Sequence, residues 1–91
     1  MSVIIRIPTP LRSLTGGSAE AEVGAGSLRD VLTALEAAHP GVAARVLDET
    51  GALRRFVNVY VGDDDVRFLD GLATAVPDGT TVSILPAVAG G

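Results

Sequence analysis

The first 23 residues contain two runs in which apolar and polar positions alternate. Val3, Ile5 and Ile7 share one face of a predicted strand, because side chains two residues apart in a strand point the same way. Small apolar and acidic residues alternate over residues 19–23, which is typical of a half-exposed strand. Gly16-Gly17 marks a turn in the loop between the two strands. The pattern predicts an N-terminal hairpin with a longish loop.

A helical pattern follows this hairpin. Its apolar residues recur three and four positions apart on one face: Leu28, Val31, Leu32, Leu35 and Ala38. Ser27 is a predicted N-cap, and Asp30 stands in the first turn, where the helix dipole favours negative charge. His39-Pro40-Gly41 ends the pattern, and a short second helical piece is predicted around residues 42–47.

The second half of the chain predicts further strands. Residues 56–61 form a strand with its valines on one face, and residues 62–65 turn the chain into a short strand over residues 66–68. Pro77-Asp78-Gly79 predicts a tight turn before the last strand, residues 81–85. One main helix packed on a mixed sheet of four to five strands makes a two-layer α+β domain.

The first and last strands are both apolar and are expected to lie side by side in the middle of the sheet. That arrangement is the β-grasp, or ubiquitin-like, fold. We expect one such domain over residues 1–86, followed by a flexible C-terminal tail over residues 87–91.

Charge and composition exclude several classes of function. The net charge is −4 and the seven basic residues, all arginine, are scattered, so the chain lacks the footprint that nucleic-acid binding requires. No apolar run approaches the roughly 20 residues that cross a bilayer. No signal-peptide pattern is present, and we expect a soluble cytoplasmic protein. The sequence has no Cys and no Lys, which excludes thiolate metal sites, cysteine nucleophiles and Schiff-base chemistry.

The segment after the last strand is built from small residues and is the candidate reactive end. Glycine has no Cβ, so the Gly90-Gly91 pair can pass through a narrow channel. Six extended residues from Pro86 onward reach roughly 20 Å, enough to enter a partner's active site. A terminal carboxylate, with a pKa of about 3.3–3.7, is ionised and must be activated before it reacts. Adenylation by ATP, followed by displacement of AMP by sulfide or a persulfide, would leave a thiocarboxylate at Gly91.

Residues 84–91, Ile-Leu-Pro-Ala-Val-Ala-Gly-Gly, resemble the C-terminal motif of the MoaD/ThiS sulfur-carrier family. The likeness is clearest from about Phe56 to Gly91, through residues 56–61, 65–68 and 71–74. Within the family, this half most resembles the carriers of thiocarboxylate-dependent cysteine synthesis. The first half is similar more loosely, at Ile7-Pro8-Thr9 and Leu11-Arg12.

The resemblance implies a protein cosubstrate and not an enzyme. An E1-like adenylyltransferase/sulfurtransferase would bind the end of the chain and modify Gly91; the expected binding residues include Gly90, Ala89, Val88, Ala87 and Pro86. The sulfur would pass to a PLP-dependent cysteine synthase, and a metallopeptidase would release cysteine. Related carriers serve thiamin, molybdopterin and thiosugar biosynthesis, so a biosynthetic sulfur transferase is another possible partner. ATP and PLP would belong to these partners, and no cofactor is expected on this chain.

Two aromatic residues of the strand at 56–61 lie opposite its valine face. We predict a docking surface around Phe56, Tyr60, Leu85 and Val88, since exposed apolar patches mark partner sites. The alternative is that these residues cover a second small core under the loops.

Other interpretations stay open at this point. The chain is alternatively a ubiquitin-like modifier joined through Gly91 to lysines of target proteins, since adenylation is common to both routes. A third possibility is a small interaction domain with an incidental Gly-Gly end. Asp63-Asp64-Asp65 is interpreted as a solvated turn and His39 as a helix-terminal residue, so no metal site is predicted.

Overall fold

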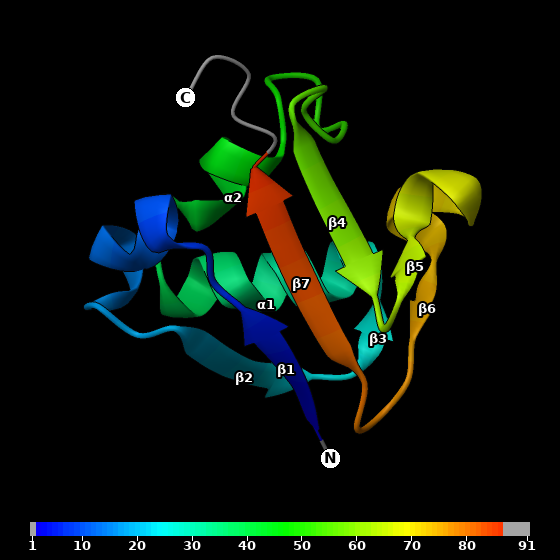
Figure 1. Cartoon of the computed structure of the whole chain (residues 1–91), viewed down its shortest axis with the longest axis horizontal. Coiled ribbons are helices and arrows are strands. Elements are labelled where there is room, and N and C mark those ends of the chain that lie inside the picture. Colours follow the sequence, from blue (N-terminus) through cyan, green and yellow to red (C-terminus); the bar gives the residue numbers. More distant parts are fainter. Residues whose placement is uncertain (1, 87–91) are drawn as a thin grey trace.

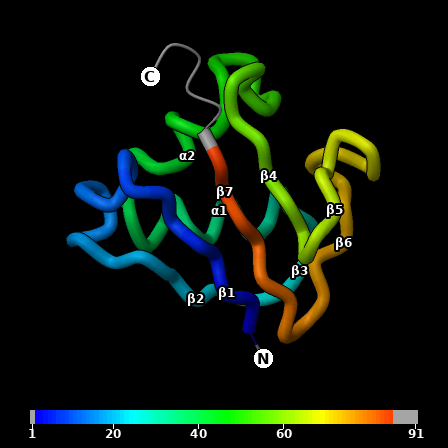
Figure 2. Tube along the Cα trace, viewed as in Figure 1, coloured from blue at the N-terminus to red at the C-terminus, as the bar shows by residue number. Residues whose placement is uncertain are grey.

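The computed structural model describes residues 2–86, and its centre is a five-stranded mixed sheet in the order β2-β1-β7-β4-β5 (Figure 1). Strand β1 (Ser2–Arg6) pairs antiparallel with β2 (Glu20–Gly24) and parallel with β7 (Thr81–Pro86). Strand β4 (Val57–Val61) pairs antiparallel with β7 and with β5 (Asp64–Asp65). The first and last strands therefore run side by side in the middle of the sheet, which confirms the predicted β-grasp fold (Figure 2).

Helix α1 (Leu28–Ala38) crosses one face of this sheet (Figure 1). It begins with a reciprocal cap: the Ser27 hydroxyl accepts a 3.2 Å hydrogen bond from the N–H of Asp30, and the Asp30 carboxylate accepts one of 3.2 Å from the N–H of Ser27. The predicted apolar face is buried except at Ala38, which is exposed. Ala38 is the last helical residue, three positions beyond Leu35, which is the last buried residue of the helix.

The core fills the space between α1 and the inner face of the sheet. Alternate residues of the three long central strands point inward, as the period-2 patterns predicted. The buried members that β1, β4, β7 and α1 contribute are Val3, Ile5, Leu28, Val31, Leu32, Leu35, Val57, Val59, Val61, Val82 and Ile84. All the buried hydrophobic residues of this core are aliphatic. Their continuous packing fixes the positions of the strands, and therefore of the strand ends.

A second short helix, α2 (Val42–Val46), follows α1 after a tight turn. The carboxylate of Glu36 accepts hydrogen bonds from the N–H groups of Gly41, at 3.0 and 3.1 Å, and of Ala43, at 2.9 Å. These contacts lower the pKa of Glu36, because they stabilise its ionised form. His39 ends α1, as predicted, and its N–H donates to the carbonyl of Leu35 at 2.8 Å.

The structure corrects the sequence analysis at several short segments. Residues 66–68, predicted as a strand, form the 3-10 helix η2 (Val66–Phe68), because the Asp65 carboxylate caps the N–H of Arg67 at 2.9 Å and turns the chain. The loop expected between the first two strands contains the 3-10 helix η1 (Thr9–Thr15). A two-stranded ribbon of β3 (Gly26–Ser27) and β6 (Ala75–Val76) and the 3-10 helix η3 (Gly71–Ala73) were not predicted.

Candidate functional site

Strand β7 carries the chain out of the sheet and ends at Pro86. Its last two rungs on β4 are Asn58 with Leu85 and Val57 with Pro86. The N–H of Gly62 donates to the carbonyl of Thr81 at 2.9 Å. Gly62 and Thr81 are therefore a hydrogen-bonded pair of opposite residues. In an antiparallel ladder such pairs alternate with non-hydrogen-bonded ones, so Asn58 and Leu85, four positions along, are also hydrogen-bonded. Pro86 falls on a non-hydrogen-bonded rung, where its missing N–H removes no bond to β4.

The residues predicted to react and to enter a partner lie mostly beyond this point. Gly91, Gly90, Ala89, Val88 and Ala87 lie outside the described residues. Pro86 is the last residue of β7, one residue after Leu85. The structure therefore describes the origin of the expected tail and leaves the predictions about residues 87–91 as predictions.

The predicted docking residues that are described lie on or beside the outer face of the sheet, opposite α1. Phe56 precedes β4 and is 62% exposed, and Leu85 on β7 is 49% exposed. Tyr60 is half-buried and stands opposite Ser83, two residues from Leu85 on the same face of β7. Phe56 and Leu85 are too exposed to cover a second small core. Their role in docking stays a prediction.

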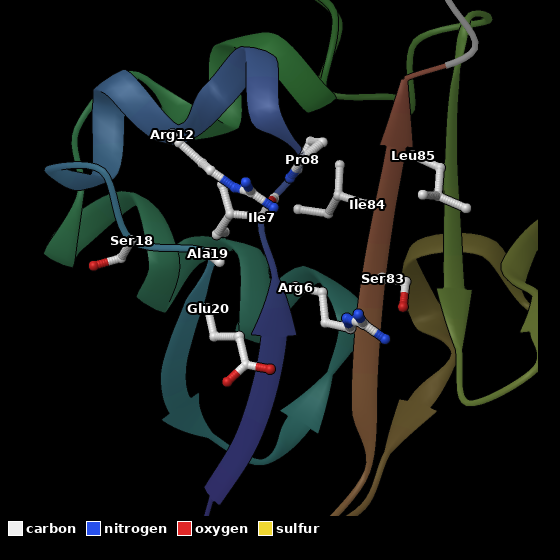
Figure 3. Close-up of a pocket in the computed structure, with 10 residues that line it drawn as sticks. All are labelled: Arg6, Ile7, Pro8, Arg12, Ser18, Ala19, Glu20, Ser83, Ile84 and Leu85. Carbon is white, nitrogen blue, oxygen red and sulfur yellow. The ribbon is translucent and has the colours of Figure 1, made fainter.

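Beside Leu85 the outer face is hollowed by an open depression of about 680 Å³ (Figure 3). Strands β1, β2 and β7, the helix η1 and the segments that join η1 to β1 and β2 contribute its lining: Arg6, Ile7, Pro8, Arg12, Ser18, Ala19, Glu20, Ser83, Ile84 and Leu85. Strand register places Arg6 between Glu20 and Ser83. The Nε of Arg12 donates to the carbonyl of Ile7 at 3.0 Å, which fixes the base of that guanidinium. The depression offers a partner two guanidinium groups next to an exposed leucine.

The sequence analysis did not single out these two arginines as site residues. Arg6 and Arg12 are six positions apart and belong to different elements, a strand and a 3-10 helix. No sequence spacing predicts that these two side chains lie near each other. The pairing of β1 with β7, which places Arg6 beside Ser83, is a tertiary contact. Only the predicted central position of the first and last strands could have suggested that their outward-facing residues meet.

Other chemistry is limited within the part of the chain that the structure describes. Residues 2–86 contain no cluster of three side chains able to hold a metal ion. Asp63 is exposed in a turn, as interpreted, but Asp64 and Asp65 form strand β5, because they pair with Val61 and Tyr60 of β4. Among the described residues, no helix is both long enough and apolar enough to cross a membrane.

Comparison with known proteins extends beyond the described residues. The ThiS family matches residues 5–91. Sulfur carrier protein CysO from Mycobacterium tuberculosis is 50% identical over 93 residues, an alignment that covers 100% of both chains. Small archaeal modifier protein 3 from Haloferax volcanii is 47% identical over 62 residues, covering 68% of this chain and 66% of the relative.

Solved structures agree with the fold and with the family. A chain in the crystal structure of the Amycolatopsis orientalis BexX/CysO complex superposes with a TM-score of 0.92 at 47% identity, covering 98% of this chain and 99% of that one. The resemblance in the strand and tail motifs is thereby confirmed over the whole chain. With a family match from residue 5 to residue 91 and full-length relatives at 50% identity, the chain belongs to the ThiS family of ubiquitin-like β-grasp sulfur carriers.

Proposed function

We propose that the Gly91 carboxylate of this carrier is converted to a thiocarboxylate by an E1-like partner and donates its sulfur in cysteine biosynthesis or a related sulfur-metabolite pathway. The observation that carries the proposal is the full-length identity of 50% to a protein named as a sulfur carrier, in a match that runs through Gly91. The chain would be a cosubstrate, and catalysis would belong to its partners. Because activation consumes ATP, the pathway would run in the cytoplasm.

The proposed activation has two balanced steps. A carboxylate oxygen of Gly91 attacks the α-phosphorus of ATP, pyrophosphate leaves, and a mixed anhydride with AMP forms. Sulfide then attacks the acyl carbon, the bond to AMP breaks, and a thiocarboxylate remains. If a persulfide is the donor, an additional thiol must reduce the acyl disulfide to release the same product. The side-chain-free Gly90-Gly91 pair suits this chemistry, because the acyl carbon must pass deep into the partner.

In the cysteine pathway, the thiocarboxylate sulfur would attack an acceptor derived from activated serine in a PLP-dependent synthase. A metallopeptidase would then hydrolyse the carrier–cysteine bond, releasing cysteine and restoring the Gly91 carboxylate. Service to a thiosugar, thiamin or molybdopterin pathway would use the same activated end with another acceptor. A carrier shared between pathways would need only one docking surface for its activating enzyme.

Intact-mass spectrometry of the protein from its native host tests the proposal directly. Replacing one terminal oxygen with sulfur adds about 16 Da, and the added mass should map to the C-terminal peptide. Deleting Gly90-Gly91 should abolish this modification and leave the melting temperature within error of the full chain, because the described core lies within residues 2–86. A carrier that stays unmodified in cells where its E1-like partner is active would contradict the proposal.

We also propose that the partner docks on the outer sheet face around Phe56, Tyr60, Leu85 and Val88. Support comes from the exposure of Phe56 and Leu85 and from the depression beside Leu85, with its two guanidinium groups. A relative of this chain was crystallised as the BexX/CysO complex, so a chain of this fold does form a stable complex with another protein.

Leu85→Asp tests this surface. The half-exposed side chain permits a native fold, whereas a carboxylate in an apolar contact is costly to desolvate, so the yield of thiocarboxylate should fall at least about tenfold. Phe68→Asp is the matched control: Phe68 is 87% exposed and lies on η2, outside the proposed surface. Normal thiocarboxylation of a folded Leu85→Asp variant would remove Leu85 from the docking surface.

A second candidate function is that of a protein modifier. The observation that favours it is the relative named small archaeal modifier protein 3, with 47% identity over 62 residues. Gly91 would then form an isopeptide bond with a lysine of a target. An immunoblot of host lysate separates the two functions, because conjugates appear as a ladder of high-mass species that resists thiol treatment, whereas a carrier alone gives one band.

A further inference from the structure

Arg67 holds the segment that leads into strand β4. From η2 its Nη2 donates to the carbonyl of Arg54 at 2.6 Å and to the carbonyl of Val57 at 2.6 Å. Its Nη1 donates to the side-chain oxygen of Asn58 at 2.7 Å. Charged donors make short and strong hydrogen bonds, and the planar guanidinium can serve these acceptors at once. A single side chain thus holds residues 54–58 in one arrangement.

Arg67 is itself fixed at its backbone. The Asp65 carboxylate accepts a hydrogen bond of 2.9 Å from the N–H of Arg67, and the neighbouring Val66 is completely buried. The start of β4 is therefore tied to η2, which follows the end of β4 across the short turn through β5. Without Arg67, the buried valines would still hold β4 in the core.

The residues that Arg67 holds are the partners of the end of β7. Val57 pairs with Pro86, and Asn58 pairs with Leu85 in the last hydrogen-bonded rung. On its other side, β7 pairs with β1 only as far as Ser83, opposite Arg6. From residue 84 onward, β4 is the only strand paired with β7 within the described part of the chain. The direction in which the chain leaves the sheet thus depends on the end of β4 that Arg67 holds.

We propose that Arg67 is a positioning residue that, through Val57 and Asn58, sets the direction in which the C-terminal segment leaves β7 toward a partner's active site. This inference rests on the proposed activation of Gly91. Orientation of a reacting group contributes strongly to rate, so a loosened last rung should lower the rate of activation after docking more than it lowers docking itself. Of the proposed docking residues that the structure describes, Tyr60 and Leu85 lie outside the segment that Arg67 holds, and Phe56 lies within it.

Arg67→Lys is the test variant, because lysine keeps the charge and loses the planar fork. Adenylation is followed as pyrophosphate release from ATP with an E1-like enzyme of the source organism. We expect kcat to fall about five- to tenfold, in keeping with the rate cost of a small misplacement, and KM to change by a smaller factor, because Phe56 lies within the held segment. Arg29→Lys, on the exposed face of α1, is the matched control and should match the wild type.

Amide hydrogen exchange measures how firmly the end of β7 is held, and it needs no partner protein. In Arg67→Lys, exchange at the N–H of Leu85 should become several-fold faster, while the N–H groups of β1 and the centre of α1 should keep their protection. Asn58→Ala removes one of the three short contacts and should shift both readouts in the same direction by less. If the wild type is never adenylated, the proposed function fails, and the exchange at Leu85 still tests Arg67.

Three results would overturn the inference. One is unchanged kcat and unchanged exchange at Leu85 in Arg67→Lys. Another is a rise in KM alone, which would make Arg67 a docking contact. The third is loss of protection across the whole sheet, or unfolding of both Arg67→Lys and Asn58→Ala, which would assign these contacts to stability of the fold alone.

Discussion

Glu36 is the residue whose ionisation is most directly tied to local structure. Its carboxylate accepts hydrogen bonds from the N–H groups of Gly41 and Ala43, and these bonds lower its pKa below the ordinary value of 4.5. A group with a lowered pKa in the folded state stabilises that state above its unfolded pKa. This stabilisation is lost as the pH falls through the lowered folded pKa. The junction of α1 and α2 should therefore weaken in acid.

Glu36→Gln removes the charge and one of the two acceptor oxygens. We expect this variant to melt at a lower temperature than the wild type at pH 7, and the difference to shrink as the pH falls below 4.5. Thermal melts from pH 7 to pH 3 measure both effects. Asp48, whose pKa is lowered mainly by a hydrogen bond from the Thr50 side chain, titrates in both proteins and cancels in the comparison. A difference in melting temperature between wild type and Glu36→Gln that stays the same at every pH would contradict this account.

At the scale of elements, helix α1 was predicted together with its cap. Ser27→Ala should destabilise the fold by about 1 kcal/mol, because the N–H of Asp30 loses its hydroxyl acceptor, while the backbone N–H of residue 27 can still donate to the Asp30 carboxylate. Chemical denaturation followed by circular dichroism measures the change. Thr33→Ala, at an exposed position within the same helix, is the control and should stay within about 0.5 kcal/mol of the wild type. Equal stability of the two variants would show that the cap contributes nothing.

The long elements could be predicted because each has one buried face, with a period that a sequence displays. Short elements could not, because they show no repeated buried face, and a few individual hydrogen bonds or strand pairings decide them. Val66-Arg67-Phe68 alternates like a strand, yet the Asp65 cap and the reach of Arg67 to residues 54–58 make it a 3-10 helix. The ribbon of β3 and β6 exists because Gly26–Ser27 meets Ala75–Val76 across the fold.

The candidate site divides in the same way. The small residues after β7 indicated the reactive end, because glycine and a terminal carboxylate have recognisable chemistry wherever the chain lies. The depression lined by Arg6 and Arg12 could not be predicted, because the pairing of β1 with β7 sets the place of Arg6. The hydrogen bonds of Arg67 to residues 54–58 could not be predicted either, because they depend on the 3-10 helix η2.

At the scale of the whole molecule, the composition suits a body that must not react with its own activated end. The 91 residues contain no Lys and no Cys, and all seven basic residues are arginine, which is not a nucleophile at neutral pH. An acyl adenylate at Gly91 therefore meets no thiol and no lysine amine on a second copy of the chain.

We expect the activated chain to remain free of covalent dimers. Incubation with an E1-like enzyme and ATP, without a sulfur source, at pH 8 and in the presence of a phosphine reductant should give no band near twice 9.2 kDa on a denaturing gel. Ala37→Cys, on the exposed side of α1, is the positive control. About a quarter of its thiol is ionised at pH 8, for a pKa of about 8.5, so it should yield a dimer that resists the phosphine and is cleaved by hydroxylamine, as a thioester is. A wild-type dimer that survives both reagents would reveal acylation of the α-amino group and would contradict the view that this composition keeps the activated end for its partners.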